Sequence, residues 1–121
     1  MHIQFAELPV FDQVRARAFY TEHFGCETAA DQPMPGQEWR WIELRFPNAE
    51  TTLHFLPRKD EELSKGPVLV LVADHLDDLI ARIRSAGVEI TLDPQSAPWR
   101  PETTIAEFRD SEGNRIGVSS R

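Results

Sequence analysis

Cysteine and long apolar runs are scarce in this 121-residue chain, and each scarcity excludes a class of protein. Because Cys26 is the single cysteine, no internal disulfide can form, and we expect a reducing, cytoplasmic location. No apolar run approaches the roughly 20 residues that a membrane helix needs, and the N-terminal segment lacks the pattern of a secretory signal peptide. We therefore expect no membrane partner.

Basic charge is also scarce. The chain has 13 Lys and Arg against 20 Asp and Glu, which gives a net charge of −7. Because an acidic chain repels phosphate backbones, we expect no nucleic-acid partner, whereas cationic ligands would be attracted. Glycine-rich phosphate loops and the G-x-S-x-G nucleophile motif are both missing, so the sequence signals neither a nucleotide cofactor nor a serine hydrolase.

The two halves of the chain repeat the same start. Each half begins with an apolar strand, continues with a helix that ends at a glycine, and enters a second strand. Residues 13–24 are predicted to form the first helix, with Asp12 as its N-cap and Gly25 as its left-handed C-cap. In the second half Asp74 and Gly87 take these two places at the same spacing.

The two halves also end alike, each in a pair of strands around a polar turn. The predicted pairs are 39–46 with 51–57, and 103–110 with 115–120. Each half is therefore predicted to be a βαβββ module, and two such modules must combine because one alone cannot bury its apolar face. The sequence predicts one domain of α+β class.

The module boundaries follow from this repeat. Module one covers residues 1–57, module two covers residues 67–121, and the charged segment 58–66 links them.

Three stretches carry a resemblance to a known family: VFDQVRARAFYTEHFG (10–25), VADHLDDLIARIRSAGV (72–88) and FRDSEGNRIGV (108–118). In this order and spacing they resemble the vicinal oxygen chelate superfamily, which includes glyoxalase I, extradiol dioxygenases, and bleomycin and fosfomycin resistance proteins. The resemblance covers essentially the whole chain. It implies tandem βαβββ modules forming a curved mixed sheet, a half-barrel with helices on its convex side, and a homodimer.

The resemblance also implies where metal ligands would lie, namely at Phe5, His54, Val68 (or its neighbour Pro67) and Gly117. Three of these four positions carry no donor atom, and one histidine cannot hold a divalent ion. We therefore expect no metal cofactor. The alternative is a rebuilt metal site that uses His54 with Glu43 or Glu107.

Strand alternation predicts which side chains line the concave face. The predicted ligand-binding residues are Phe5, Glu7, Trp41, Glu43, His54, Glu107, Arg109 and Gly117. Apolar walls with a few oriented polar groups are typical of a small-molecule site. Gly117 is expected to open room there.

Plainer interpretations of these side chains stay open. Glu43 with Arg45, and Glu107 with Arg109, are two apart on one strand face and are equally suited to pair as surface ions. His54 is equally suited to be a hydrogen-bonded wall residue.

Trp99 lies in the proline-rich segment SAPWRP, which we expect to be a loop that caps the cavity or fills a dimer contact.

Three functions are compatible with these residues. The first is a metal-free protein of the glyoxalase and bleomycin resistance type that sequesters a small molecule in a dimer cleft, with no catalytic residue. The alternative is a diverged lyase or isomerase of the glyoxalase superfamily that uses His54 with Glu43 or Glu107, with or without a metal. The third is a structural or regulatory partner with a vestigial cleft, in which Trp41 and Trp99 are buried against each other.

Overall fold

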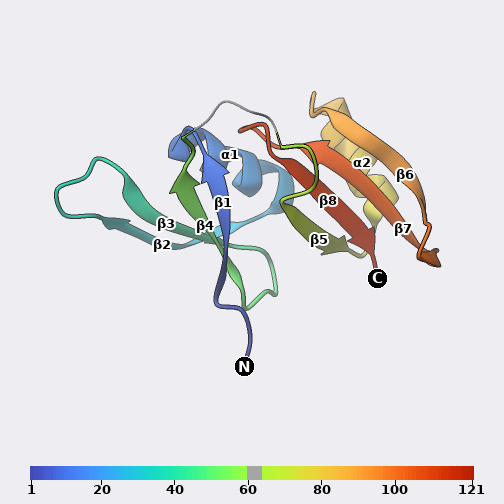
Figure 1. The fold of residues 1–121 in the computed structure, drawn as a ribbon, viewed down its shortest axis with the longest axis horizontal. Coiled ribbons are helices and arrows are strands. Elements are labelled where there is room, and N and C mark those ends of the chain that lie inside the picture. Colours follow the sequence, from blue (N-terminus) through green and yellow to red (C-terminus); the bar gives the residue numbers. More distant parts are fainter. Residues whose placement is uncertain (60–63) are drawn as a thin grey trace. The chain divides into compact units, whose positions relative to one another are not determined.

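The computed structural model of the protein describes residues 1–59 and 64–121 (Figure 1). The chain divides into two compact units, with the boundary after residue 61. This boundary falls in the predicted linker 58–66, of which residues 60–63 lie outside the described residues.

Unit one is a four-stranded mixed sheet with one helix. Its elements are β1 (Phe5–Val10), α1 (Gln13–Phe24), β2 (Glu27–Pro33), β3 (Arg40–Arg45) and β4 (Thr52–Pro57). The strand order is β1-β4-β3-β2, in which β1 runs parallel to β4 and the other neighbours are antiparallel.

Unit two repeats this arrangement. Its elements are β5 (Leu69–Ala73), α2 (Leu76–Ser85), β6 (Ile90–Ala97), β7 (Arg100–Arg109) and β8 (Arg115–Ser120). The strand order is β5-β8-β7-β6, and β5 runs parallel to β8. The predicted α+β fold of two βαβββ modules is thereby confirmed.

Helix α1 has the boundaries and both caps that the sequence predicts. The Asp12 carboxylate accepts hydrogen bonds from the backbone N–H groups of Val14 and Arg15, each at 3.0 Å. Gly25 ends the helix with a φ of 68°, a left-handed conformation that glycine adopts without steric cost. The fully buried Tyr20 packs its ring near Phe55 of β4, so α1 covers one face of the sheet in unit one.

Helix α2 departs from the prediction at its start. His75, not Asp74, is its N-cap residue, and the His75 side chain makes no capping hydrogen bond within the described structure. The Asp74 carboxylate instead pairs with Arg121 at the end of the chain. At the other end Gly87 has a φ of 92°, as expected for a residue just past a helix.

The segment SAPWRP is a tight hairpin rather than the expected loop. Strand β6 runs to Ala97 and β7 begins at Arg100, which leaves Trp99 at the tip with 74% of its surface exposed. Pro101 is tolerated in β7 because this end of the strand pairs with β6 alone; pairing of β7 with β8 begins only at Ile105.

We expect the two predicted caps to differ in their effect on stability. Replacing Asp12 by alanine should lower the free energy of unfolding by about 1 kcal/mol, because two helix N–H groups lose their acceptor. The matched change Asp74→Ala removes only an exposed ion pair and should cost about 0.5 kcal/mol or less. Urea denaturation followed by circular dichroism measures both values, and equal losses would contradict this account of α2.

Candidate functional site

The register of β1, β4 and β3 brings predicted site residues onto one face of unit one. Glu7 of β1 and Glu43 of β3 both lie directly opposite His54 of β4, and Phe5 lies opposite Thr52. Residues opposite each other on neighbouring strands share a face. Five of the eight predicted ligand-binding residues belong to this face, as the alternation predicts.

Three rings on this face form an aromatic cluster, made of Phe5, Trp41 and His54. The Trp41 and His54 rings stack with centroids 3.8 Å apart and planes 26° apart. Phe5 meets both rings edge-on, at 5.4 Å from His54 and 5.8 Å from Trp41. His54 is only 4% exposed, whereas Phe5 and Trp41 are half-buried, so the cluster offers the surfaces of these two outer rings.

The Glu43 carboxylate is held beside the cluster by two donors. Its Oε1 accepts a hydrogen bond from Thr52 Oγ1 at 2.5 Å, and its Oε2 accepts one from Trp41 Nε1 at 2.7 Å. These two hydrogen bonds hold the pKa of Glu43 below its usual value; the bond from the Thr52 hydroxyl has the larger effect and the bond from the Trp41 indole the smaller. Glu43 is therefore a fixed negative charge at neutral pH.

Thr52 is a site residue that the ligand-binding set lacks. Alternation places it on the face, but only the cross-strand register shows that its hydroxyl reaches Glu43. Two spacings in the sequence signal this contact. Thr52 lies two residues before His54 on one strand, and Glu43 lies two residues after Trp41 on the neighbouring strand.

His54 makes an incomplete polar contact. Its Nδ1 is buried and has no hydrogen-bond partner among the described residues. Glu7 Oε1 lies 3.5 Å from this nitrogen, and the Glu7 side chain is 47% exposed. Within unit one the carboxylate in ion-pair contact with His54 is thus Glu7, while Glu43 lies opposite His54 on the neighbouring strand.

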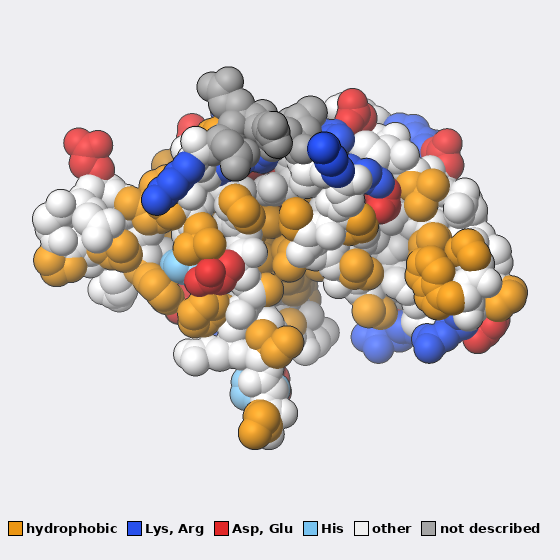
Figure 2. Space-filling view, viewed as in Figure 1, with side chains coloured by type: hydrophobic (Ala, Val, Ile, Leu, Met, Phe, Trp, Pro, Cys, Tyr) orange, Lys and Arg blue, Asp and Glu red, His pale blue; other side chains and the backbone are white. Residues whose placement is uncertain are grey.

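Figure 2 shows hydrophobic side chains, an acidic side chain and a histidine close together on the surface of unit one. This mixture is the composition expected of a small-molecule site, in which apolar walls carry a few oriented polar groups.

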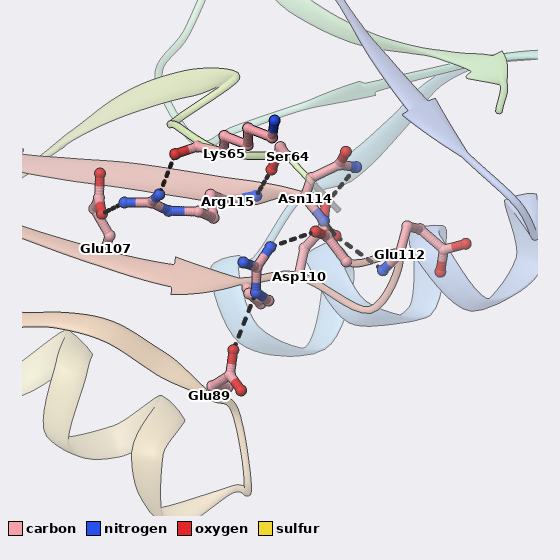
Figure 3. Close-up of polar contacts among 10 residues, drawn as sticks. Ser64, Lys65, Glu89, Glu107, Asp110, Glu112, Asn114 and Arg115 are labelled. Carbon is pink, nitrogen blue, oxygen red and sulfur yellow. Dashed lines mark hydrogen bonds and ion pairs between the residues drawn. The ribbon is translucent and has the colours of Figure 1, made fainter. Parts of the chain in front are cut away.

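In unit two the predicted polar residues are engaged in ion pairs (Figure 3). The Glu107 carboxylate, 12% exposed, pairs with Arg115 of the neighbouring strand β8. Arg109 pairs with Glu89 at 3.1 Å and donates a hydrogen bond to the Gly113 carbonyl at 2.8 Å. The ion pair suggested between Glu107 and Arg109 is thus replaced by two others, because Arg115 reaches Glu107 across the strands.

Gly117 does not open the room that we expected. It lies opposite Glu107 on one side and Val70 on the other. A Cβ added at Gly117 would lie 3.3 Å from Cγ2 of Val70 and 3.5 Å from Cβ of Pro67. Neighbouring side chains of the same unit therefore fill this space, and the glycine permits their close approach.

The hairpin that precedes Gly117 has a structural role. The Asp110 carboxylate accepts hydrogen bonds from the backbone N–H groups of Glu112 and Asn114, at 2.8 and 2.9 Å, and Gly113 has a φ of 81° (Figure 3). Asp110, Glu112 and Asn114 are all buried. These residues hold the turn together.

The residues present do not fit the metal that the family resemblance implies. The side chains of Phe5, Val68 and Gly117 carry no donor atom. Across residues 1–59 and 64–121, no three or more His, Cys, Asp or Glu side chains gather as a metal would require.

A separate hollow of about 280 Å³ lies at the start of α2. It is lined by residues of unit two, namely Asp74, His75, Leu76, Asp77, Asp78, Thr104 and Ser120. None of the predicted ligand-binding residues is among them.

Comparison with known proteins defines the family. Residues 2–118 match the model of the Glyoxalase/Bleomycin resistance protein/Dioxygenase superfamily, and the chain belongs to this superfamily. The chain is 33% identical over 108 residues to the uncharacterized protein YetH of Bacillus subtilis (strain 168), an alignment that covers 87% of this chain and 86% of YetH. None of the helices in the described ranges has the length and apolar character to cross a membrane.

Two solved structures show the range of the likeness. One is TnmS3, an antibiotic binding protein from Streptomyces sp. CB03234, with a TM-score of 0.80, 31% identity, and coverage of 99% of this chain and 95% of TnmS3. The other is glyoxalase I from Zea mays, with a TM-score of 0.79 and 22% identity, of which the match covers 98% of this chain and 44% of the maize chain. The likeness to the maize protein shows the fold alone.

The pKa of Glu43 provides a test of the contacts around it. Replacing Thr52 by valine removes the stronger of the two donors, so the pKa of Glu43 should rise toward the ordinary value of 4.5. A lowered pKa stabilises the fold above the unfolded-state value, and this stability is lost as pH falls through the folded value. The variant should therefore lose less stability between neutral and acid pH than the wild type.

Carbon-detected NMR titration of the glutamate carboxyl groups measures this pKa directly. The matched control is Thr51→Val, which removes an exposed hydroxyl that donates to the Ile3 carbonyl and does not touch Glu43. A Glu43 pKa that stays the same in Thr52→Val would show that the hydroxyl does not determine it.

Proposed function

We propose that this chain is a metal-free small-molecule binding protein that sequesters its ligand. The observation that carries the proposal is the aromatic cluster of unit one beside the fixed carboxylate of Glu43. The 31% identity to an antibiotic binding protein over almost its whole length supports the same class of function. A cytoplasmic location is part of the proposal, and it suits the lone Cys26, whose pKa burial raises to about 12.

The proposed site uses two kinds of contact. Phe5 and Trp41 offer apolar ring surface, on which an aromatic group of a ligand can stack or meet edge-on. Glu43 supplies a negative charge that its two donors hold in place, and Glu7, whose side chain is 47% exposed, adds a second carboxylate beside Nδ1 of His54. This combination favours a ligand that has an aromatic body and a positively charged or hydrogen-bond-donating group.

The proposal also includes Glu107 and Arg109 of the second module as ligand-binding residues. Glu107 and Arg109 keep part of their side-chain surface exposed although each has an ion-pair partner. The Glu89 side chain is 66% exposed, so replacing it as the partner of Arg109 by a ligand group should cost little stability.

We further propose that two chains form the binding cleft as a homodimer. Strand β5 is the outermost strand of its sheet; Val70 and Val72 on it are 65% and 59% exposed, and Val68, just before it, is 40% exposed. An apolar edge strand that stays uncovered promotes pairing with another chain. A second copy is the partner that a symmetric assembly supplies.

A diverged lyase or isomerase is the second candidate function. The buried, unbonded Nδ1 of His54 beside Glu7 favours it, because a histidine oriented by a carboxylate is suited to proton transfer. Elemental analysis separates the metal-dependent case from the metal-free one. His54→Ala should abolish activity if the protein is this enzyme, and only change ligand affinity if it is a binding protein.

Ligand binding should depend on Trp41 and not on Trp99. Calorimetric screening with cationic glycopeptide and planar aromatic antibiotics should identify at least one compound with saturable binding. For that compound Trp41→Ala should weaken the affinity about fivefold or more, since a stacked aromatic contact contributes about 1 kcal/mol or more. The control Trp99→Ala changes an exposed tryptophan of unit two and should alter the affinity less than about twofold. No saturable binder, or equal effects of the two changes, would count against the proposed site.

The assembly can be tested independently of any ligand. Val70→Asp places a charge on the exposed apolar row of β5 and should convert a dimer into a monomer in sedimentation equilibrium. Val14→Asp is the matched control, because Val14 is 70% exposed on helix α1 and should leave the dimer intact. A wild-type chain that sediments as a monomer would refute the dimer.

A further inference from the structure

The contact between His54 and Glu7 determines which nitrogen of the imidazole carries the proton. A neutral imidazole has one N–H donor and one acceptor nitrogen. If Nδ1 were the acceptor, its lone pair would face the Glu7 carboxylate at 3.5 Å and remain buried without a donor. With the proton on Nδ1, the same carboxylate becomes an acceptor within reach of a small rotation of a side chain that is 47% exposed. The surroundings therefore favour the Nδ1–H form.

The other charged groups that face His54 do not offer Nδ1 an alternative partner. From β3, both carboxylate oxygens of Glu43 are engaged by Thr52 and Trp41. Arg45, also on β3, lies opposite Thr52 and is a cation, so it cannot accept a proton from the ring. From β1, Glu7 lies directly opposite His54.

We propose that Glu7 is the positioning residue of His54: it keeps Nδ1 protonated, which leaves Nε2 as the hydrogen-bond acceptor of the ring. A carboxylate that binds one ring nitrogen fixes both the tautomer and the orientation of the imidazole. Because Nε2 lacks a hydrogen in this form, a ligand group that reaches this nitrogen must carry an O–H or N–H donor. This inference rests on the proposed function, and it names a second selection rule besides aromatic character.

The tautomer can be measured on the free protein without any ligand. Long-range proton–nitrogen correlation NMR distinguishes the Nδ1–H from the Nε2–H form of each histidine, at a pH where the same spectra show the ring to be neutral. We expect the Nδ1–H form for His54. Glu7→Leu removes the acceptor and should lower the ratio of Nδ1–H to Nε2–H at least about tenfold, because a hydrogen bond to a charged group contributes about that factor.

Two further variants exclude a general effect of charge or folding. Glu7→Gln keeps an acceptor oxygen and should retain most of the Nδ1–H form. Glu22→Leu removes the same charge from an exposed position on α1 and should leave the tautomer unchanged. A wild-type His54 in the Nε2–H form, or a ratio that Glu7→Leu does not change, would overturn the inference.

The acceptor role is tested with phenol and its methyl ether, anisole, at millimolar concentrations. Phenol carries an O–H donor and should shift the Nε2 resonance of His54, whereas anisole should shift only the ring protons of Phe5 and Trp41. The absence of a phenol-specific shift would overturn the acceptor role.

The inference and the proposed function can fail separately. An Nδ1–H tautomer of His54 in a protein that binds no antibiotic would refute the proposed function alone. An Nε2–H tautomer of His54 in a protein that binds an antibiotic would refute this inference alone.

Discussion

The parallel pairing of each module's first strand with its last strand is the constraint on which the rest of the site depends. In unit one this pairing sets Glu7 opposite His54, and the antiparallel neighbour sets Glu43 on the other side of the same histidine. A shift of one residue would turn all of these side chains toward α1 and bring Leu8 and Phe55 to the outer face. The complete burial of those two residues beneath α1 is therefore what keeps the polar face in register.

The same topology gives different chemistry in the two units. The pair that corresponds to Glu7 and His54 in unit two is Val70 and Gly117, which also lie opposite each other across parallel strands. Neither of these side chains can donate, accept or titrate. The duplicated fold thus concentrates its polar, proton-binding groups on unit one, while unit two offers an apolar row along its edge strand and two ion pairs.

The sequence was sufficient to predict that Phe5, Glu7, Trp41, Glu43 and His54 share one face of unit one. Side chains alternate between the two faces of a strand, and the buried apolar residues of each module show which face is turned toward the core. The caps of α1 were predictable for a similar reason, because Asp12 and Gly25 act on backbone groups close to them in sequence. What alternation cannot supply is the distance between side chains on neighbouring strands.

The differences between prediction and structure follow from that missing distance. The carboxylate of Glu107 pairs with Arg115 across strands, the hydroxyl of Thr52 binds Glu43 across strands, and Val70 fills the space next to Gly117. Asp74 fails as a cap because Arg121, at the far end of the module, binds its carboxylate. In each case the two partners are well separated in the sequence. Which residues meet therefore depends on three-dimensional packing, which no local sequence pattern encodes.

Protonation separates the roles of Glu43 and His54. A group acts well as a general acid or base when its pKa is near the working pH, whereas the hydrogen bonds to Glu43 move its pKa further from neutrality. Glu43 is therefore suited to be a permanent charge that orients a ligand. The His54 ring is the group of the cluster that can both donate and accept a hydrogen bond. A site built from one fixed charge, two ring surfaces and one adaptable imidazole can select a ligand by shape, charge and hydrogen bonding without needing a metal.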